Sequence, residues 1–139
     1  MPLSDADPAP PAPPPEGQGL AVAAETLYLV NLLVVPGVAF VILVYLYLRH
    51  RASAPVLALG HLQQTVAASL WAGLLLVLIN GLILWLGGYD EPWTWVVLLL
   101  YFTTCHAALV LLGVVGVARA MAGKPYRYPV IGPRLPAEN

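Results

Sequence analysis

His106 and Cys105 are the most versatile side chains in a long apolar stretch of this 139-residue sequence. A histidine there could relay protons or ligate haem, a pigment or a metal. A bis-histidine haem needs a second histidine at similar depth, whereas His50 and His61 lie beside a different segment. Neighbouring helical residues point about 100° apart, so Cys105 and His106 chelate poorly. We therefore expect His106 to be hydrogen-bonded within a helix bundle and predict no cofactor or metal, with a cofactor on His106 as the alternative.

No other set of residues forms a recognisable catalytic site. Asp90 and Glu91 are adjacent in a turn, which is the wrong arrangement for an acid/base pair across a substrate. The sequence contains no P-loop, dinucleotide fingerprint, zinc spacing or nucleophile elbow. We predict that the protein is not an enzyme.

The composition favours lipid over water as the solvent of this chain. Hydrophobic residues make up 60% of the sequence and charged residues only 9%, against about 25% charged residues in soluble domains. The mean hydropathy is +0.80. We expect an all-α membrane protein with a single folded domain.

Three stretches are apolar and long enough to cross a bilayer, for which a helix needs about 20 residues. They run roughly over residues 26–48, 65–86 and 93–118. Pro36 should kink the first helix, with Gly37 beside it. The glycines and the proline of residues 87–92 predict a tight turn, so the second and third spans should form an antiparallel hairpin.

The spans and the segments around them divide the chain into three predicted regions. These are a tail over residues 1–25, a membrane domain over 26–118 and a basic cytoplasmic tail over 119–139. No lysine or arginine precedes Arg49, so the start does not resemble a secretory signal. Residues 8–15 read PAPPAPPP, which predicts an extended, disordered periplasmic tail or a docking strand for a partner.

The charges predict an orientation. All six basic residues follow the first or the third span, and six of the seven acidic residues precede the first span or join the second to the third. The excess of basic residues in cytoplasmic segments then places the amino terminus outside and the carboxyl terminus inside. We expect a multi-pass protein of the bacterial inner membrane.

Polar side chains inside the spans are expected to hold helices together, because interhelical hydrogen bonds stabilise membrane bundles modestly. These intramembrane packing candidates are Asn31, Asn80, Thr103 and His106. Asn31 and Asn80 could meet between the first two helices. Alternatively, all four could line the lumen of a homo-oligomeric channel.

A second set of candidates lies on the cytoplasmic side, where cations pair with lipid phosphates and tyrosines prefer the headgroup layer. A short interfacial helix could begin at Pro55. The lipid or partner contact candidates are Arg49, Arg51, His61, Gln64, Arg119, Lys124, Tyr126, Arg127 and Tyr128.

Several of these residues carry a resemblance to a known family. The cationic run 49–51, His61, Gln64 and the tail motif 123–129 (GKPYRYP) resemble a family of small bacterial membrane proteins of unknown function. That family is distantly grouped with the twenty-kilodalton channel subunit of the chloroplast inner-envelope protein translocon. The resemblance covers roughly residues 30–132 and implies a helical membrane fold without an established activity.

We expect a structural or accessory subunit that packs against a larger membrane complex. Abundant small and aromatic residues, and a bundle too small to enclose a pathway, favour this function. Its partners would be membrane lipids and other integral membrane subunits, with no nucleic acid. The alternatives are a homo-oligomeric channel or translocation component, and a cofactor-bearing subunit that uses His106.

Overall fold

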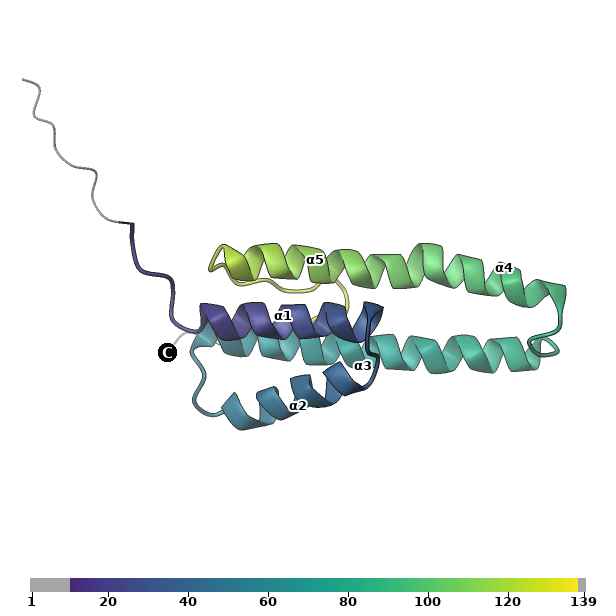
Figure 1. The fold of residues 1–139 in the computed structure, drawn as a ribbon, viewed down its shortest axis with the longest axis horizontal. Coiled ribbons are helices and arrows are strands. Elements are labelled where there is room, and N and C mark those ends of the chain that lie inside the picture. The colour runs from purple at the N-terminus through teal and green to yellow at the C-terminus, as the bar shows by residue number, and fades with distance from the viewer. Residues whose placement is uncertain (1–10, 138–139) are drawn as a thin grey trace, which may run out of the picture.

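The computed structural model describes residues 11–137, which form an elongated bundle of helices (Figure 1). Its elements are α1 (Gln18–Leu33), α2 (Val38–His50), α3 (Val56–Trp85), α4 (Pro92–Tyr101), the π-helical segment η1 (Phe102–His106) and α5 (Ala107–Met121). We call the end where α1 and α3 begin and α2 and α5 end the basal end. The turn between α3 and α4 marks the distal end. The prediction of an all-helical chain is confirmed for the described residues.

The first predicted span is two helices instead of one. The chain leaves α1 at Leu33 and reverses, so that α2 returns beside α1 to the basal end (Figure 1). Pro36 lacks an amide hydrogen, and Gly37 takes a φ of +85°, a region that side chains disfavour. The expectation of a single kinked helix over residues 26–48 was therefore wrong, because Pro36 and Gly37 end one helix and allow a sharp turn.

Every backbone amide hydrogen of this turn finds an acceptor close by. The amides of Val34 and Val35 both donate to the carbonyl oxygen of Val30 at 2.9 Å. The amide of Gly37 donates to the side-chain oxygen of Asn31, also at 2.9 Å. Because an unpaired buried amide costs free energy, this local pairing lets the turn sit away from water.

The long helix α3 begins earlier than the second predicted span. Pro55 precedes its first turn, and the helix continues without a break for 30 residues from Val56 to Trp85. The predicted interfacial helix at Pro55 is therefore the first part of α3. The connection from α2 shrinks to residues 51–55.

The last three elements follow one another in a single rod that runs antiparallel to α3 (Figure 1). Gly87 and Gly88 adopt φ values of +117° and +99° in the turn that joins α3 to α4. Thr94 donates a hydrogen bond to the carbonyl oxygen of Gly88 at 2.6 Å. The predicted hairpin of the last two long helices, with its glycine turn, is confirmed.

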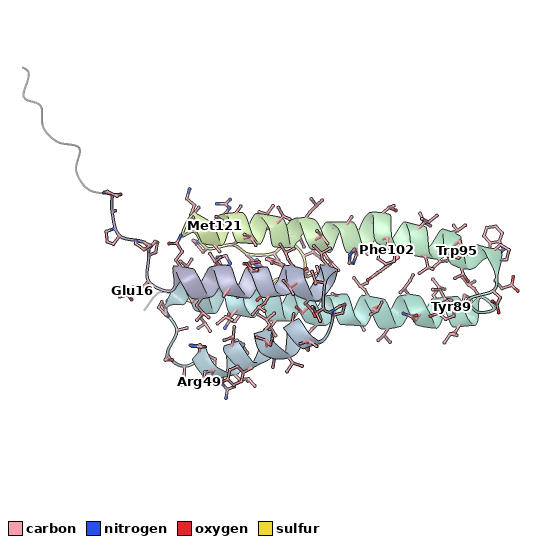
Figure 2. All side chains as sticks on the ribbon, viewed as in Figure 1. Glu16, Arg49, Tyr89, Trp95, Phe102 and Met121 are labelled. Carbon is pink, nitrogen blue, oxygen red and sulfur yellow. The ribbon has the colours of Figure 1, made fainter. Side chains whose placement is uncertain are left out.

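Two helical stretches are long and apolar enough to cross a membrane, Val56–Trp85 and Pro92–Met121. Figure 2 shows Glu16 and Arg49 at the basal end and Tyr89 and Trp95 at the distal end. These two pairs of residues therefore mark the opposite ends of the bundle. The first predicted span, residues 26–48, is not found as a continuous helix among residues 11–137.

The core occupies the basal half of the bundle. Buried positions recur at helical spacing on α1 (Ala21, Ala24, Glu25, Tyr28, Asn31), on α3 (Ala58, His61, Leu62, Thr65, Ala68, Ser69, Ala72) and on α5 (Leu109, Gly113, Gly116, Ala120). After Ala72 the next buried residue of α3 is Ile83. The distal half consists of α3 and α4 alone, so most of its apolar side chains are uncovered by this chain.

Two glycines of α5 let α1 approach closely. A Cβ atom on Gly113 would lie 2.8 Å from the ring of Tyr28, and one on Gly116 would overlap the carboxyl group of Glu25. The absence of both side chains therefore admits Tyr28 and Glu25 into the interface between α1 and α5.

Gly116→Ala should destabilise the fold by about 1–3 kcal/mol, because the added methyl group overpacks the space that Glu25 fills. Gly81→Ala is the matched control, since a Cβ atom there meets nothing within 4 Å. Denaturant unfolding in detergent, followed by circular dichroism, measures both. Equal stability of the two variants would contradict the close approach of α1 to α5.

Candidate functional site

A buried acid–histidine pair joins α1 to α3 near the basal end. Glu25 is completely buried, and His61 is 1% exposed. Nδ1 of His61 lies 2.6 Å from Oε1 of Glu25. Nε2 of His61 lies 3.1 Å from the backbone carbonyl oxygen of Lys124, at the start of the carboxyl-terminal tail. The imidazole ring thus connects the first helix, the third helix and the tail.

The hydrogen-bond partners determine how many protons the pair holds. A carbonyl oxygen only accepts, so Nε2 of His61 carries a proton and donates it to Lys124. The contact with Glu25 then holds one further proton, either on Nδ1 of His61 or on the carboxyl group. Both arrangements are neutral overall, so the pair buries no net charge and avoids the main cost of an isolated buried ion.

The hydroxyl group of Tyr128 completes the surroundings of the carboxyl group by donating to Oε2 of Glu25. Burial, together with the adjacent Glu25, raises the pKa of the Tyr128 hydroxyl, so Tyr128 keeps its proton as a donor. Burial also raises the pKa of the Glu25 carboxyl group, against the opposing effect of the hydrogen bonds from His61 and Tyr128.

Gln64 fastens the tail to α3, one turn after His61. Its side-chain oxygen accepts a hydrogen bond of 3.0 Å from the amide of Tyr128. Its side-chain nitrogen donates to the carbonyl oxygen of Pro133 at 2.8 Å. A Cβ atom on Gly132 would overlap the Gln64 side chain, so this position of the tail needs glycine. We call Glu25, His61, Gln64 and Tyr128 together the clasp.

The clasp corrects part of the predicted surface. His61, Gln64 and Tyr128 were expected to contact lipid or a partner, but all three are buried and hydrogen-bonded inside the protein. They are buried because the tail folds back over α1 and α3 instead of extending from α5. Tyr126 is partly buried beside Tyr128, with ring centroids 5.2 Å apart.

The predicted cationic contacts remain on the surface. Arg49, Arg51, Arg119, Lys124 and Arg127 are exposed, and they belong to the end of α2, the end of α5 and the tail. These cations belong to two separate segments of the sequence, and the structure brings both segments to the basal end. Their contact with lipid or a partner stays a prediction.

The four predicted packing residues do not form one group. Asn31 binds the turn at Gly37, whereas Asn80 donates to the carbonyl oxygen of Leu76 and accepts from Tyr89. The hydroxyl of Thr103 donates to the carbonyl oxygen of Leu99 in its own helix. Asn31 and Asn80 could have met between the first two helices, but their hydrogen bonds go to Gly37 and to Leu76 and Tyr89 instead.

Glu25 is the functional residue that sequence reasoning missed. It was assigned to the extramembrane tail, because the first span was taken to start at residue 26. The structure instead extends α1 back to Gln18. A usable signal was present: Ala21, Ala24 and Tyr28 share a helical face with Glu25, and only a paired carboxylate fits such a face.

The clasp is suited to holding segments together. Within residues 11–137 no group of three or more histidine, cysteine, aspartate or glutamate residues could hold a metal ion. Glu25 and His61 alone offer two ligands, and both are engaged inside the protein. Comparison of this chain with family models, curated proteins and solved structures finds no match. The resemblance drawn from the tail motif therefore stays a prediction.

Gln64→Ala should release the tail, because it removes both hydrogen bonds that fix Tyr128 and Pro133. Trypsin cleavage after Arg127, timed by mass spectrometry on the protein in detergent, should become roughly tenfold faster, as two lost hydrogen bonds imply. Gln63→Ala is the matched control on the same helix and should cleave at the rate of the unchanged protein. Equal rates for both variants would mean that Gln64 does not hold the tail.

Proposed function

We propose that this chain is an integral membrane protein that inserts α3 and the α4–α5 rod across the bilayer, with the α1–α2 hairpin reaching only part of the way from one side. The hydrocarbon layer is about 30 Å thick, which matches about 20 helical residues. Counted back from Trp85, that length reaches the level of Thr65, one turn beyond His61. From Glu25 to Leu33 the helix α1 rises about 12 Å, roughly half of that layer.

The distribution of charge supports an orientation with the basal end in the cytoplasm. All six basic residues belong to α2, the residue that follows it, α5 or the tail and lie toward this end, whereas Asp90 and Glu91 occupy the distal turn. The excess of basic residues in cytoplasmic segments then places the start of α1 inside as well. This arrangement replaces the outside amino terminus expected from three crossings, and it fits the inner membrane of a bacterium.

Within that membrane we propose that the protein is a non-enzymatic subunit that packs against other membrane-embedded helices. The observation that carries this proposal is the incomplete packing of the distal half. In the most apolar 18-residue stretch of each rod, few residues are buried. The buried share is 22% in Val56–Trp85 and 17% in Pro92–Met121. A cavity of about 320 Å³ separates α3 from the α4–η1 segment, with Leu78 and Leu100 among its walls.

Two helices with a cavity between them do not form a complete membrane bundle. Membrane helices associate through close van der Waals contact, which this cavity interrupts between α3 and the α4–η1 segment. The basal half, by contrast, has four helices and a hydrogen-bonded interior. A helix supplied by a partner would complete the distal half in the way that α1 and α2 complete the basal half.

Purification of the tagged protein from its native membranes in a mild detergent tests this function. We expect another integral membrane protein to elute with it in fixed stoichiometry, identified by mass spectrometry. Leu84→Ala with Leu99→Ala should weaken this association, because both side chains are exposed on the distal half. Leu48→Ala with Val41→Ala is the matched control on α2 and should leave it unchanged.

Two results would contradict the accessory function. Elution of the protein alone as a colourless homo-oligomer would favour the channel alternative. A visible absorption band that follows the protein would favour a cofactor-bearing subunit, with His106 as the first residue to replace.

A further inference from the structure

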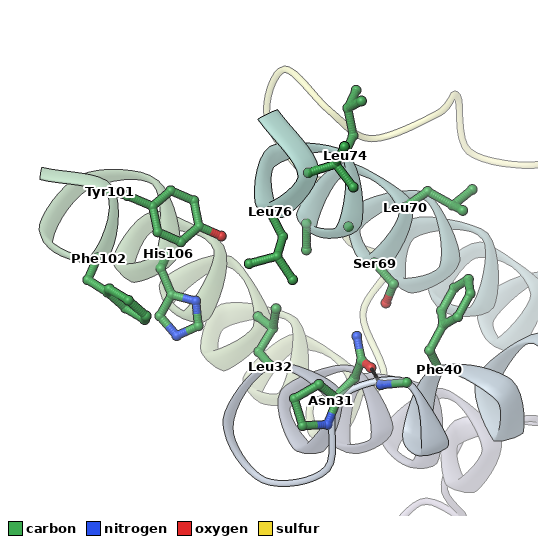
Figure 3. A pocket seen from close by; sticks show the side chains of 15 residues that line it. Asn31, Leu32, Phe40, Ser69, Leu70, Leu74, Leu76, Tyr101, Phe102 and His106 are labelled. Atoms are coloured by element: carbon green, nitrogen blue, oxygen red, sulfur yellow. Dashed lines mark hydrogen bonds between the residues drawn. The ribbon is translucent and has the colours of Figure 1, made fainter. Parts of the chain in front are cut away.

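An open cavity of about 650 Å³ lies where the tip of the α1–α2 hairpin meets α3 and η1 (Figure 3). Its walls are mainly apolar, with a small number of polar side chains. Binding sites for small molecules have typical volumes of 300–1,000 Å³ and this same mixture of surfaces. The cavity is separate from the clasp, whose four residues do not line it.

Ser69 gives the first sign that this cavity receives a ligand. Its side chain is buried, and its hydroxyl oxygen has no hydrogen-bond partner within residues 11–137. Hydroxyl groups in helices commonly bond to the carbonyl oxygen four residues earlier, as Thr65 and Thr103 do here. Ser69 instead directs its hydroxyl group into the cavity (Figure 3). A buried hydroxyl group left unpaired costs about 1–3 kcal/mol, which a ligand oxygen would recover.

Asn31 supplies a second donor on the same side. Its side-chain oxygen accepts the amide hydrogen of Gly37, and this bond fixes which end of the amide is oxygen. The side-chain nitrogen therefore faces the cavity, close to Ser69 in Figure 3. An NH₂ group only donates, so this side of the cavity favours an acceptor oxygen.

The opposite wall comes from the π-helical segment and the residue before it. Single π-helical turns inside α-helices are frequent at functional sites, because the extra residue changes which side chains share a face. Here Tyr101, Phe102 and His106 all line the cavity. The rings of Phe102 and His106 meet edge to face with centroids 5.1 Å apart. The hydroxyl group of Tyr101 points toward the cavity in Figure 3.

The charge and shape of the lining restrict the ligand. No lysine, arginine, aspartate or glutamate is among the described residues that line the cavity, so it suits a neutral molecule. Polar groups occupy two facing walls, and aromatic rings lie between apolar side chains. Several lining residues are themselves exposed, among them Leu70, Leu74 and Val77, so the cavity opens onto the apolar surface of the bundle.

We propose that this cavity binds a lipid-soluble ring with carbonyl oxygens on opposite sides, which is the chemistry of a quinone. One carbonyl oxygen accepts from Ser69 and Asn31, and the other faces Tyr101 and His106. The ligand enters from the hydrocarbon layer, so the proposal rests on the membrane location proposed above. It concerns binding alone and adds a small-molecule ligand to a protein proposed as an accessory subunit.

The binding test uses the full chain in nanodiscs of synthetic phosphatidylcholine, which contain no quinone. A benzoquinone with a decyl tail is titrated, and saturable quenching of tryptophan fluorescence is measured against empty nanodiscs. We expect saturable binding that an excess of decylbenzene, which has the tail and a ring but no oxygen, does not displace. Displacement by decylbenzene would overturn the proposal, because the site would then recognise only apolar bulk.

Gly73→Leu tests the location of the site. A Cβ atom at Gly73 meets nothing within 4 Å, and Gly73 lines the cavity, so a leucine there should extend into the cavity. Gly81→Leu is the same change on the same helix, also in open space but outside the cavity. We expect at least tenfold weaker binding for the first variant and unchanged binding for the second. Equal binding by both would overturn the proposal.

Ser69→Ala tests the recognition of oxygen. Loss of one hydrogen bond should weaken quinone binding roughly three- to tenfold, while Ser53→Ala in the exposed α2–α3 connection should not. Undiminished binding by Ser69→Ala would remove the evidence for a carbonyl acceptor and overturn the proposal. Co-elution with a membrane partner is measured on the same variants. The proposals of quinone binding and of an accessory function are therefore tested separately.

Discussion

Glu25 places a carboxyl group in the interior of a strongly apolar bundle. The basal half is arranged so that this carboxyl group is hydrogen-bonded. His61 and Tyr128 hydrogen-bond its two oxygens, Gly116 leaves it room on α5, and Gln64 holds Tyr128 in place. These contacts join α1 to α3, α5 and the tail, all of which lie far from α1 in the sequence. Because a buried carboxyl group without partners is costly, the tail must fold back and α1 must lie against α3 for this half to form.

The second constraint is the reversal of the chain after α1. A turn inside an apolar environment is stable only when its amides are paired, and here Val30 and Asn31 supply the acceptors. The reversal ends α1 and begins α2 near the middle of α3, so the bundle has four helices at one end and two at the other. This uneven cross-section produces both the cavity at the hairpin tip and the unfinished distal half.

Local patterns in the sequence predict the helical class, the two long apolar rods and the glycine turn at residues 87–92, because each depends on neighbouring residues only. The first span was misread because Pro36 and Gly37 fit a kinked helix and a hairpin equally well in hydropathy and length. Contacts between distant residues decide between them, above all Glu25 with His61. Likewise, the tail motif 123–129 does not reveal that Tyr128 turns inward. That orientation depends on the contacts of Tyr128 with Gln64 and Gly132.

The sidedness of α1 tests the central claim most directly. In a cysteine-free background made with Cys105→Ser, the variants Glu16→Cys, Ser53→Cys and Asp90→Cys each place one thiol at an exposed position. A membrane-impermeant maleimide is applied to sealed vesicles of known orientation. The hairpin predicts that Glu16→Cys is labelled from the same side as Ser53→Cys and opposite to Asp90→Cys. Labelling of Glu16→Cys from the side of Asp90→Cys would mean that the first segment crosses the membrane, and would contradict the account.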